Sequence, residues 1–301
     1  MTDIAHSLPT QRVGFAGVGL MGHGMAKNIV EKGYPLTIIG RRNRAPVDDL
    51  VSRGATEAKS PLDMARACDI VFLCLTASTD VAEVVAAMKP GLSPGSVVVD
   101  CSTSEPTVTE RLSGELAEMG VHYADAPLSR TPKEAWAGTL DCMVGASPEV
   151  FARIQPVIAT WAAKIVHIGG VGDGHRMKLL NNFLSLGYGA LYSEALAMAA
   201  KVGISVEKFD SVIRGGRMDC GFYQTFMGYA LEGNRAAHRF TLTNAYKDMR
   251  YAESMANAAG VATPLASGIK NSYALALGMG GTGSEDYVPH LADFIRRANG
   301  A

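Results

Sequence analysis

The chain has 301 residues, enough for two domains of ordinary size. Hydrophobic residues make up 48% of it and charged residues 19%, which is typical of a globular α/β protein with a sizeable core. The net charge of −1 argues against nucleic acid or a membrane surface as a partner, and no apolar run is long and charge-free enough to span a membrane. The first residues lack the basic start and apolar core of a signal peptide, so we expect a cytoplasmic protein.

Up to about residue 170, short β-branched runs alternate with helical stretches. Strands are predicted at 12–17, 36–40, 69–75, 96–102, 122–128, 141–146 and 164–169, and helices at 21–33, 60–69, 80–91, 107–120 and 148–162. Such alternation predicts a doubly wound, mostly parallel sheet of the Rossmann type. Only helical patterns follow. We therefore expect a nucleotide-binding α/β domain at 1–172 and an all-helical domain at 173–301.

The first turn of the chain has glycines in dinucleotide-binding spacing. Gly17, Gly19 and Gly22 follow the first strand and open the next helix, with Leu20 and Met21 completing the turn. The first glycine permits a tight turn, the second lets a pyrophosphate approach the backbone, and the third lets helix and strand pack closely. The helix N-terminus favours the phosphate charge. The order of strand, turn, helix and second strand supports a dinucleotide site here over an ordinary glycine-rich loop.

The end of the second strand indicates which dinucleotide is bound. NAD-binding proteins place an Asp or Glu there to hold the ribose, whereas this chain has Gly40 followed by Arg41, Arg42 and, two residues on, Arg44. Without the carboxylate a 2′-phosphate is not repelled, and an arginine fork can bind it. We therefore expect NADP rather than NAD, with Arg41 the first candidate and Arg42 or Arg44 in support. The alternative is a solvated basic turn.

The apolar stretch at 175–203 begins with a polar stripe. Lys178, Asn182 and Ser185 are spaced i, i+4 and i+7, so they share one helix face, and Asn181 lies beside it. Burying unpaired polar groups is costly, so the stripe is best explained if it lines an active-site cleft. A lysine there could donate a proton to a carbonyl oxygen as hydride arrives, and remove it in reverse. Alternatively, Lys178 snorkels at a helix end and the asparagines satisfy backbone groups.

Five motifs in order resemble the β-hydroxyacid dehydrogenase family, which includes 3-hydroxyisobutyrate dehydrogenases and tartronate semialdehyde reductases. They are GFAGVGLMGHGMAKN, DCSTSEP, DAPLSRTPKEAWAGTLDCMVG, GHRMKLLNN and YKDM, spread over nearly the whole chain.

This resemblance implies that the protein is an oxidoreductase acting on a small β-hydroxyacid or its semialdehyde. It implies that Lys178 is the catalytic acid/base and that Asn182, with Asn181, orients the substrate. It places Ser102 and Thr103 at the nicotinamide and substrate, Leu75 in the cofactor groove, and Lys247 over the cofactor. Members of the family are usually dimers or tetramers joined through the helical domain, so a homodimer or homotetramer is expected.

One departure from the family pattern concerns the substrate. Where the family commonly has Ser-Gly-Gly, with backbone amides on the substrate carboxylate, this chain has Ser129, Arg130 and Thr131. Arg130 offers a planar fork of donors to an anion. With Asn181, Asn182 and Ser185, the Arg-Thr pair looks like the 3-sulfolactaldehyde reductase branch, whose matching arginine, asparagine and serine hold a sulfonate. That branch is associated with NAD, which disagrees with Gly40. Arg130 as a surface residue of a rebuilt loop is the alternative.

Other classes of function are also to be weighed. Imine-reducing relatives of the same fold lack the lysine, so Lys178 argues against that reaction. A non-catalytic NADP-binding regulatory protein would keep the glycine turn but lose the polar stripe, which is intact here. The histidines form no ligand cluster, so no metal is predicted. His175 is interpreted as a residue at the start of a helix, and contact with substrate or cofactor is the alternative. The five cysteines lack zinc spacing and are expected to be core residues.

Overall fold

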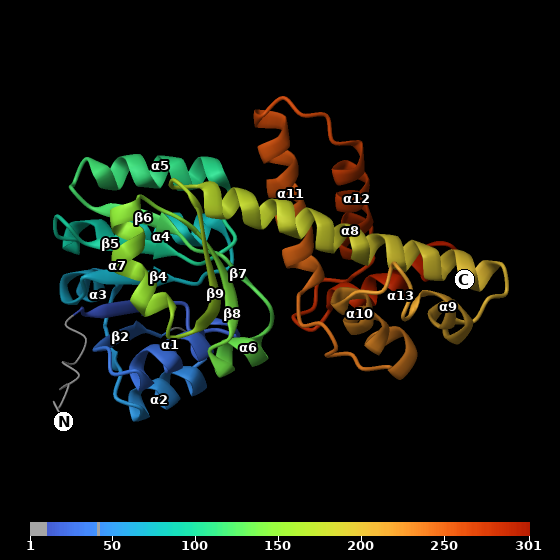
Figure 1. Cartoon of the computed structure of the whole chain (residues 1–301), viewed down its shortest axis with the longest axis horizontal. Coiled ribbons are helices and arrows are strands. Elements are labelled where there is room, and N and C mark those ends of the chain that lie inside the picture. Colours follow the sequence, from blue (N-terminus) through green and yellow to red (C-terminus); the bar gives the residue numbers. More distant parts are fainter. Residues whose placement is uncertain (1–10, 41–42) are drawn as a thin grey trace, which may run out of the picture. The chain divides into compact units, whose positions relative to one another are not determined.

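The computed structural model describes residues 11–40 and 43–301 (Figure 1). Contacts divide the chain into two units, Met1–Lys178 and Leu179–Ala301. This division falls six residues after the expected boundary at 172/173. The reason is that the long helix α8, Asp173–Lys201, begins inside the first unit, where the Asp125 carboxylate accepts backbone N–H bonds from Gly172 and His175.

The first unit is built on a nine-stranded sheet. Its strands are β1 Val13–Ala16, β2 Leu36–Ile39, β3 Thr56–Glu57, β4 Ile70–Leu73, β5 Val97–Asp100, β6 His122–Asp125, β7 Leu128–Ser129, β8 Leu140–Gly145 and β9 Ala162–Gly169. The order β3-β2-β1-β4-β5-β6 is parallel throughout. β8 then pairs antiparallel with β6 and β7, and parallel with β9. The mostly parallel doubly wound sheet is confirmed.

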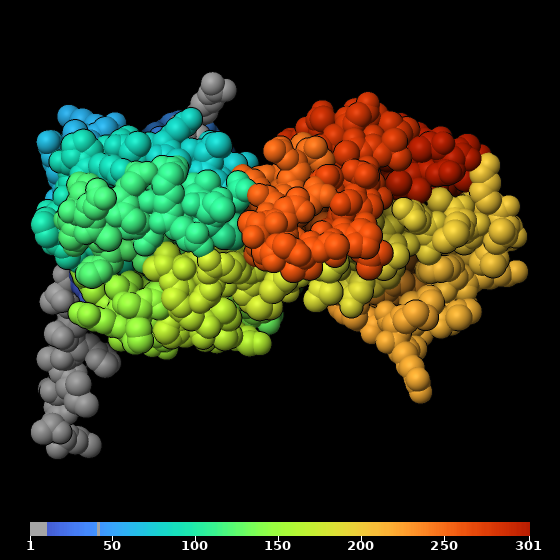
Figure 2. Space-filling view, turned by 90° about the horizontal axis from the view of Figure 1, so that it is seen from above, coloured from blue at the N-terminus to red at the C-terminus, as the bar shows by residue number. Residues whose placement is uncertain are grey.

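Helices pack against both faces of this sheet (Figure 1). They are α1 Gly22–Glu31, α2 Ala45–Ser52, α3 Pro61–Ala67, α4 Ser78–Met88, α5 Pro106–Ala117, α6 Pro132–Ala137 and α7 Pro148–Ile158, with a short 3-10 turn at Lys89–Gly91. Phe15 and Phe72 belong to the core that also includes residues of α1 and α7, whereas Val71 and Leu73 belong to the core with α4 and α5. Figure 2 shows the outer side of α5, in bluish green, on the surface of this unit.

Proline and hydroxyl side chains explain where many of these helices begin. Proline is the first residue of α3, α5, α6 and α7, where its missing N–H needs no partner. The Ser60, Thr131 and Ser147 hydroxyls accept the first orphan N–H groups of α3, α6 and α7. The sequence pattern did not predict α2 and α6. Both are short, and their apolar patterns span fewer than three turns.

The second unit is entirely helical in the part of the chain that the structure describes, as expected. It contains most of α8 and then α9 Val206–Ile213, α10 Gly221–Glu232, α11 Leu242–Ala258, α12 Pro264–Gly278 and α13 Leu291–Ala298, with a 3-10 turn at Val288–His290. Leu186, Met249 and Tyr273 lie at the centre of its main core. None of the described helices has an apolar stretch long enough to cross a membrane.

Candidate active site

The glycine turn lies between β1 and α1, and its three glycines serve different needs. A Cβ at Gly17, whose φ is +99°, would be 2.2 Å from the Cys74 carbonyl oxygen, and one at Gly22 would be 2.0 Å from the Gly17 carbonyl oxygen. A Cβ at Gly19 would have no protein atom within 4 Å. Protein packing therefore requires the first and third glycines, while the second leaves open space over the backbone. That space fits a dinucleotide pyrophosphate.

Leu20 and Met21 occupy the tip of the same turn. Leu20 is 57% exposed, whereas Met21 packs against the first core. The turn thus presents an apolar side chain next to the open backbone of Gly19.

An ion pair that the sequence pattern did not predict lies beside Gly40, between the N-cap of α2 and β3. The Arg44 guanidinium donates to both Glu57 carboxylate oxygens, at 2.7 and 2.8 Å, and holds the pKa of Glu57 below its usual range. A Cβ at Gly40 would lie 2.7 Å from Glu57 Oε1 and 2.9 Å from Arg44 Nη1. Arg44 is therefore bound to Glu57, and a side chain at position 40 would disturb that pair. The other two candidates, Arg41 and Arg42, lie outside the described residues.

The loops after β4 and β5 meet through Ser102. Its hydroxyl oxygen accepts the backbone N–H of Leu75 at 2.9 Å, and its own N–H donates to Asp100 Oδ1 at 2.9 Å. Ser102 is 3% exposed, while Leu75 and Thr103 are half-buried. A direct hydrogen bond thus joins Leu75 and Ser102, two predicted site residues from different loops.

The Ser129-Arg130-Thr131 segment joins β7 to α6. Arg130 has φ +88° and is the non-glycine residue with positive φ among those the structure describes. Its Nε lies 3.0 Å from Asp141 Oδ2. Thr131 is the N-cap of α6, and its hydroxyl contacts the Glu134 carboxylate. Two of the three predicted substrate residues therefore already have intramolecular partners.

Lys178 lies on the second turn of α8 and is 9% exposed. Lysines are rarely buried to this extent unless a partner or a function requires it. The turn before it is held by Asp125 at the end of β6, whose carboxylate accepts N–H groups from Gly172 and His175, both at 2.6 Å. Burial raises the pKa of Asp125, and His175 and the two N–H donors act in the opposite direction. This carboxylate fixes the start of the helix that carries the lysine.

The helical unit brings together the predicted residues Asn182 and Lys247 through Asp248. Asn182 Nδ2 donates to Asp248 Oδ2 at 2.7 Å, and Lys247 Nζ lies 3.0 Å from Asp248 Oδ1. Asp248 is 1% exposed. Asn181 Nδ2 reaches Asn182 Oδ1 at 3.5 Å, and the Ser185 hydroxyl bonds the Asn182 carbonyl. This cluster fixes Asn181, Asn182 and Ser185, the part of the polar stripe that belongs to the second unit.

Asp248 is a residue that the sequence analysis missed, although it lies in the quoted YKDM motif. The signal was its position relative to Ala245 and Ala252, which face the core at i−3 and i+4 on α11. An aspartate on the buried face of a helix requires a charged or hydrogen-bonding partner. Here the partners are the amide and the ammonium of two predicted site residues.

Other features of the described residues do not form such a site. A cavity of about 760 Å³ in the helical unit is lined by residues such as Leu196, Tyr229 and Asp293 and by none of the predicted site residues. Among residues 11–40 and 43–301, no group of three or more His, Cys, Asp or Glu could hold a metal ion.

Comparison with known families covers both units. Residues 12–169 match the profile of the NAD-binding domain of 6-phosphogluconate dehydrogenase. Residues 172–291 match the profile described as NAD-binding of NADP-dependent 3-hydroxyisobutyrate dehydrogenase. The two matches meet close to the start of α8.

Individual relatives agree with these profiles. The chain is 28% identical over 278 residues to 3-sulfolactaldehyde reductase of Escherichia coli, covering 91% of this chain and 93% of that one. It is 36% identical over 205 residues to 2-(hydroxymethyl)glutarate dehydrogenase of Eubacterium barkeri, covering 67% and 68%. It is also 30% identical over 281 residues to the NAD-dependent L-serine dehydrogenase of Pseudomonas aeruginosa, covering 90% and 93%.

Solved structures share the fold. 3-Hydroxyisobutyrate dehydrogenase of Mycobacterium tuberculosis with L-serine superposes with a TM-score of 0.85 at 24% identity, covering 96% of this chain and 100% of that one. An imine reductase from Pseudomonas sp. gives 0.61 at 18% identity, covering 95% and 100%. The chain therefore belongs to the β-hydroxyacid dehydrogenase family, is similar to 3-hydroxyisobutyrate dehydrogenase, and is an NAD(P)-dependent oxidoreductase.

Proposed function

We propose that this enzyme transfers hydride between NADP(H) and a small β-hydroxyacid or its semialdehyde, with Lys178 as the general acid and base. The observation that carries the proposal is the burial of Lys178, 9% exposed, on a helix whose start is fixed by Asp125. A lysine held in this way has a defined position, which proton transfer requires.

The chemistry assigns one task to each polar group. When bound, the dinucleotide supplies or accepts the hydride at the substrate carbon. The Lys178 ammonium donates a proton to the carbonyl oxygen as negative charge develops there, and the neutral amine removes it from the hydroxyl in the reverse direction. Asn181, Asn182 and Ser185 supply hydrogen bonds that orient the substrate. Ser129 and Thr131 flank its anionic group.

The proposed cofactor contacts are residues of the first unit and one residue of α11. Gly17, Gly19, Leu20, Met21 and Gly22 form the pyrophosphate turn. Leu75 is proposed to line the cofactor groove, and Ser102 and Thr103 are the proposed contacts at the nicotinamide and substrate. Lys247 is the cofactor contact proposed on α11.

NADP is proposed over NAD because Gly40 supplies no carboxylate and the Arg44–Glu57 pair occupies the space beside it. Arg41 and Arg42 are then the cations proposed for the 2′-phosphate. Replacing Arg41 with alanine should raise the KM for NADPH about 10-fold or more, because a bond between charged partners is removed. The KM for NADH should change little. A wild-type enzyme that prefers NADH would contradict this assignment.

A second candidate is reduction of 3-sulfolactaldehyde, with Arg130 on the sulfonate. Arg130 Nε is bound to Asp141, so this contact holds the guanidinium from one side. The two terminal nitrogens of a guanidinium form a fork that can bind an oxyanion. The similarity to the Escherichia coli 3-sulfolactaldehyde reductase favours the same candidate.

The experiment is a set of initial rates with NADPH and NADH on sulfolactaldehyde, succinic semialdehyde, tartronate semialdehyde and methylmalonate semialdehyde. Lys178→Ala should lower kcat about 100- to 10,000-fold, the contribution typical of a general acid or base, while NADPH binding is retained. Unchanged turnover in this variant would show that the mechanism is wrong. Absence of turnover in the wild type with every aldehyde would favour a non-catalytic NADP-binding protein.

The same rates decide between the two substrates. Efficient reduction of sulfolactaldehyde that falls about 10- to 100-fold in Arg130→Ala would identify Arg130 as the sulfonate clamp, since bonds to charged groups are worth about 1.5–3 kcal/mol. A preference for a carboxylate semialdehyde would instead indicate a substrate typical of the main family. Arg130→Lys is the matched control, because it keeps the charge and loses the fork.

A homodimer or homotetramer is also proposed. α8 exposes Leu180, Leu184, Tyr188, Leu191 and Met198, between 43% and 63% each. Contiguous exposed apolar surface of this kind marks an association site in many proteins.

A further inference from the structure

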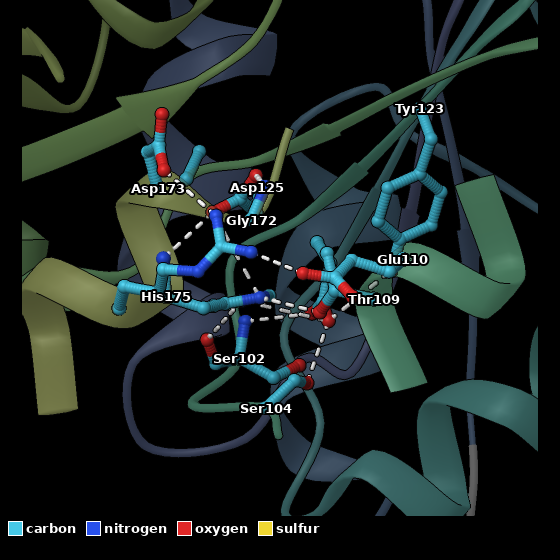
Figure 3. A network of polar contacts seen from close by, with 12 residues as sticks. Ser102, Ser104, Thr109, Glu110, Tyr123, Asp125, Gly172, Asp173 and His175 are labelled. Atoms are coloured by element: carbon cyan, nitrogen blue, oxygen red, sulfur yellow. Dashed lines mark hydrogen bonds and ion pairs between the residues drawn. The ribbon is translucent and has the colours of Figure 1, made fainter. Parts of the chain in front are cut away.

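A cluster of buried polar groups in the first unit includes, besides Asp125, residues that have no role in the proposed chemistry. Asp100, Asp125 and His175 are each 0% exposed, and Thr109 is as well. Figure 3 shows His175 near Ser102 and Thr109, with Asp125 beside Gly172. Polar groups buried this completely need partners, and here the partners come from four different segments of the chain.

The His175 ring joins two of these segments. Its Nε2 lies 3.1 Å from the Ser102 carbonyl oxygen and its Nδ1 lies 2.8 Å from the Thr109 hydroxyl oxygen (Figure 3). Because a carbonyl oxygen can only accept, Nε2 carries the hydrogen in this contact. In the neutral ring Nδ1 then accepts the Thr109 hydroxyl hydrogen. One side chain of α8 is thus bonded both to the loop after β5 and to α5.

The two aspartates hold the segments that His175 connects. Asp100, the last residue of β5, accepts the Ser102 N–H at 2.9 Å and the Ser104 hydroxyl at 2.6 Å. Asp125, the last residue of β6, accepts the N–H groups at the start of α8. The strand ends are neighbours in register, Asp100 opposite Asp125. Two adjacent strands therefore fix the loop and the helix, and His175 closes the link between them.

Lys178 lies three residues after His175 on the same helix, a rise of about 4.5 Å. A shift or rotation of this turn relative to the Ser102 loop would move the ammonium away from the reacting oxygen, and a misplacement of about 1 Å can cost 100-fold in rate. We propose that His175 is a positioning residue for Lys178, which it fixes relative to the Ser102 loop through its bonds to the Ser102 carbonyl and the Thr109 hydroxyl. This inference rests on the proposed role of Lys178.

The test compares three variants. His175→Phe keeps an aromatic ring and removes both bonds, and we expect kcat to fall at least 10-fold, with the KM for aldehyde and the Kd for NADPH within about 3-fold of wild type. His175→Gln can still donate to the Ser102 carbonyl, so it should recover much of the lost kcat. Thr109→Val removes only the hydroxyl at nearly constant shape and should give an intermediate loss, and it serves if His175→Phe does not fold.

A merely structural role for His175 would give a different pattern. The Tm would fall, kcat per folded enzyme would stay near wild type, and the glutamine variant would be no better than phenylalanine. Any of these kinetic results would overturn the proposal.

Two further measurements separate this inference from the proposed function. Lys178→Ala is assayed in parallel. If it leaves turnover unchanged, the proposed function fails, whereas if it abolishes turnover and His175→Phe does not reduce kcat, only the positioning role fails. Amide hydrogen exchange of the unliganded enzyme gives a readout independent of activity. His175→Phe should speed exchange at residues 102–104 and 176–178 at least 10-fold relative to β1, and unchanged exchange there would contradict the link.

Discussion

At the scale of a single residue, Arg130 combines an unusual backbone conformation with an ion pair. It adopts φ +88°, a conformation that glycine adopts readily and that costs other residues about 1–3 kcal/mol. The sequence identified the unusual residue because the family commonly has glycine at that position. It could not predict that the backbone would keep a glycine-like conformation, or that Asp141 would bind the guanidinium at 3.0 Å, because Asp141 lies on a different strand. A strained residue with one bound side is typical of a functional position.

The sequence pattern singled out individual polar residues on α8 but not on α11. Lys178 and Asn182 stand out in an apolar stretch, and both are buried, at 9% and 5% exposed. Asp248 does not stand out, because α11 carries many polar residues on its other faces. Its importance follows from the tertiary contact with Asn182, 66 positions earlier in the chain, and from the ion pair with the neighbouring Lys247.

Asp248 therefore carries a prediction. Asp248→Ala should lower kcat/KM for the aldehyde about 10- to 100-fold, because the Asn182 amide loses a charged acceptor and Lys247 loses its counter-ion. Asp248→Asn can still accept from Asn182 and should lose less. Initial rates test this, with NADPH affinity measured separately by fluorescence. Wild-type kcat/KM in the alanine variant would show that Asp248 only fills the core.

At the scale of elements, the strands were predicted well because parallel strands buried on both faces read as continuous apolar runs. β1, β4 and β5 are all of this kind. The antiparallel β8 and its short partner β7 were predicted less completely, since β7 is two residues long. The helix expected in the apolar stretch at 175–203 is α8, which begins two residues earlier at Asp173, and its first turns belong to the first unit. The cause is Asp125, 50 residues earlier in the chain, whose carboxylate accepts the His175 N–H. A contact between residues so far apart cannot be predicted from the local sequence pattern.

The turn between β1 and α1 yields a prediction that separates packing from binding. Gly19→Ala should leave the Tm unchanged, because its Cβ meets no protein atom within 4 Å. It should raise the Kd for NADPH about 10-fold or more, because the methyl group occupies the space that the pyrophosphate needs.

A matched substitution one turn away should behave oppositely. Gly24→Ala would place its Cβ 2.5 Å from the Trp136 N atom of α6, so α1 and α6 must separate. Overpacking of this kind costs about 1–3 kcal/mol and should lower the Tm. Gly114→Ala on the exposed face of α5, which has open space, is the control and should not lower it. Thermal denaturation with and without NADPH measures all three. A lower Tm with an unchanged Kd for NADPH in Gly19→Ala would instead show that Gly19 is needed for packing and not for cofactor binding.

For the whole molecule, the two-domain organisation followed from one change in pattern, when strands stop after β9 and only helices continue. The hydrophobic pattern could not distinguish apolar residues that face the core of their own chain from apolar residues that a second copy would cover. α8 is apolar around most of its circumference. Leu186, Ala190 and Ala197 face the core of the helical unit, whereas Leu184 and Leu191 remain exposed, at 57% and 62%. Part of the yellow segment that includes the end of α8 is visible at the surface in Figure 2.

The exposed α8 residues give the prediction for the assembly. They recur at intervals of three, four and seven residues, so they form one stripe along the helix, interrupted by the exposed charge of Glu194. If a second copy covers this stripe, Leu191→Glu places an unpaired charge in an apolar interface, and charged groups buried without partners are strongly unfavourable. Light scattering after gel filtration at micromolar concentration should then give the wild type as a dimer or tetramer and Leu191→Glu at a lower mass. Val51→Glu, at a 44% exposed position on α2 of the first unit, should keep the wild-type mass. A monomeric wild type would contradict the proposed assembly, and equal loss of mass in both variants would indicate a general effect of added charge rather than an interface on α8.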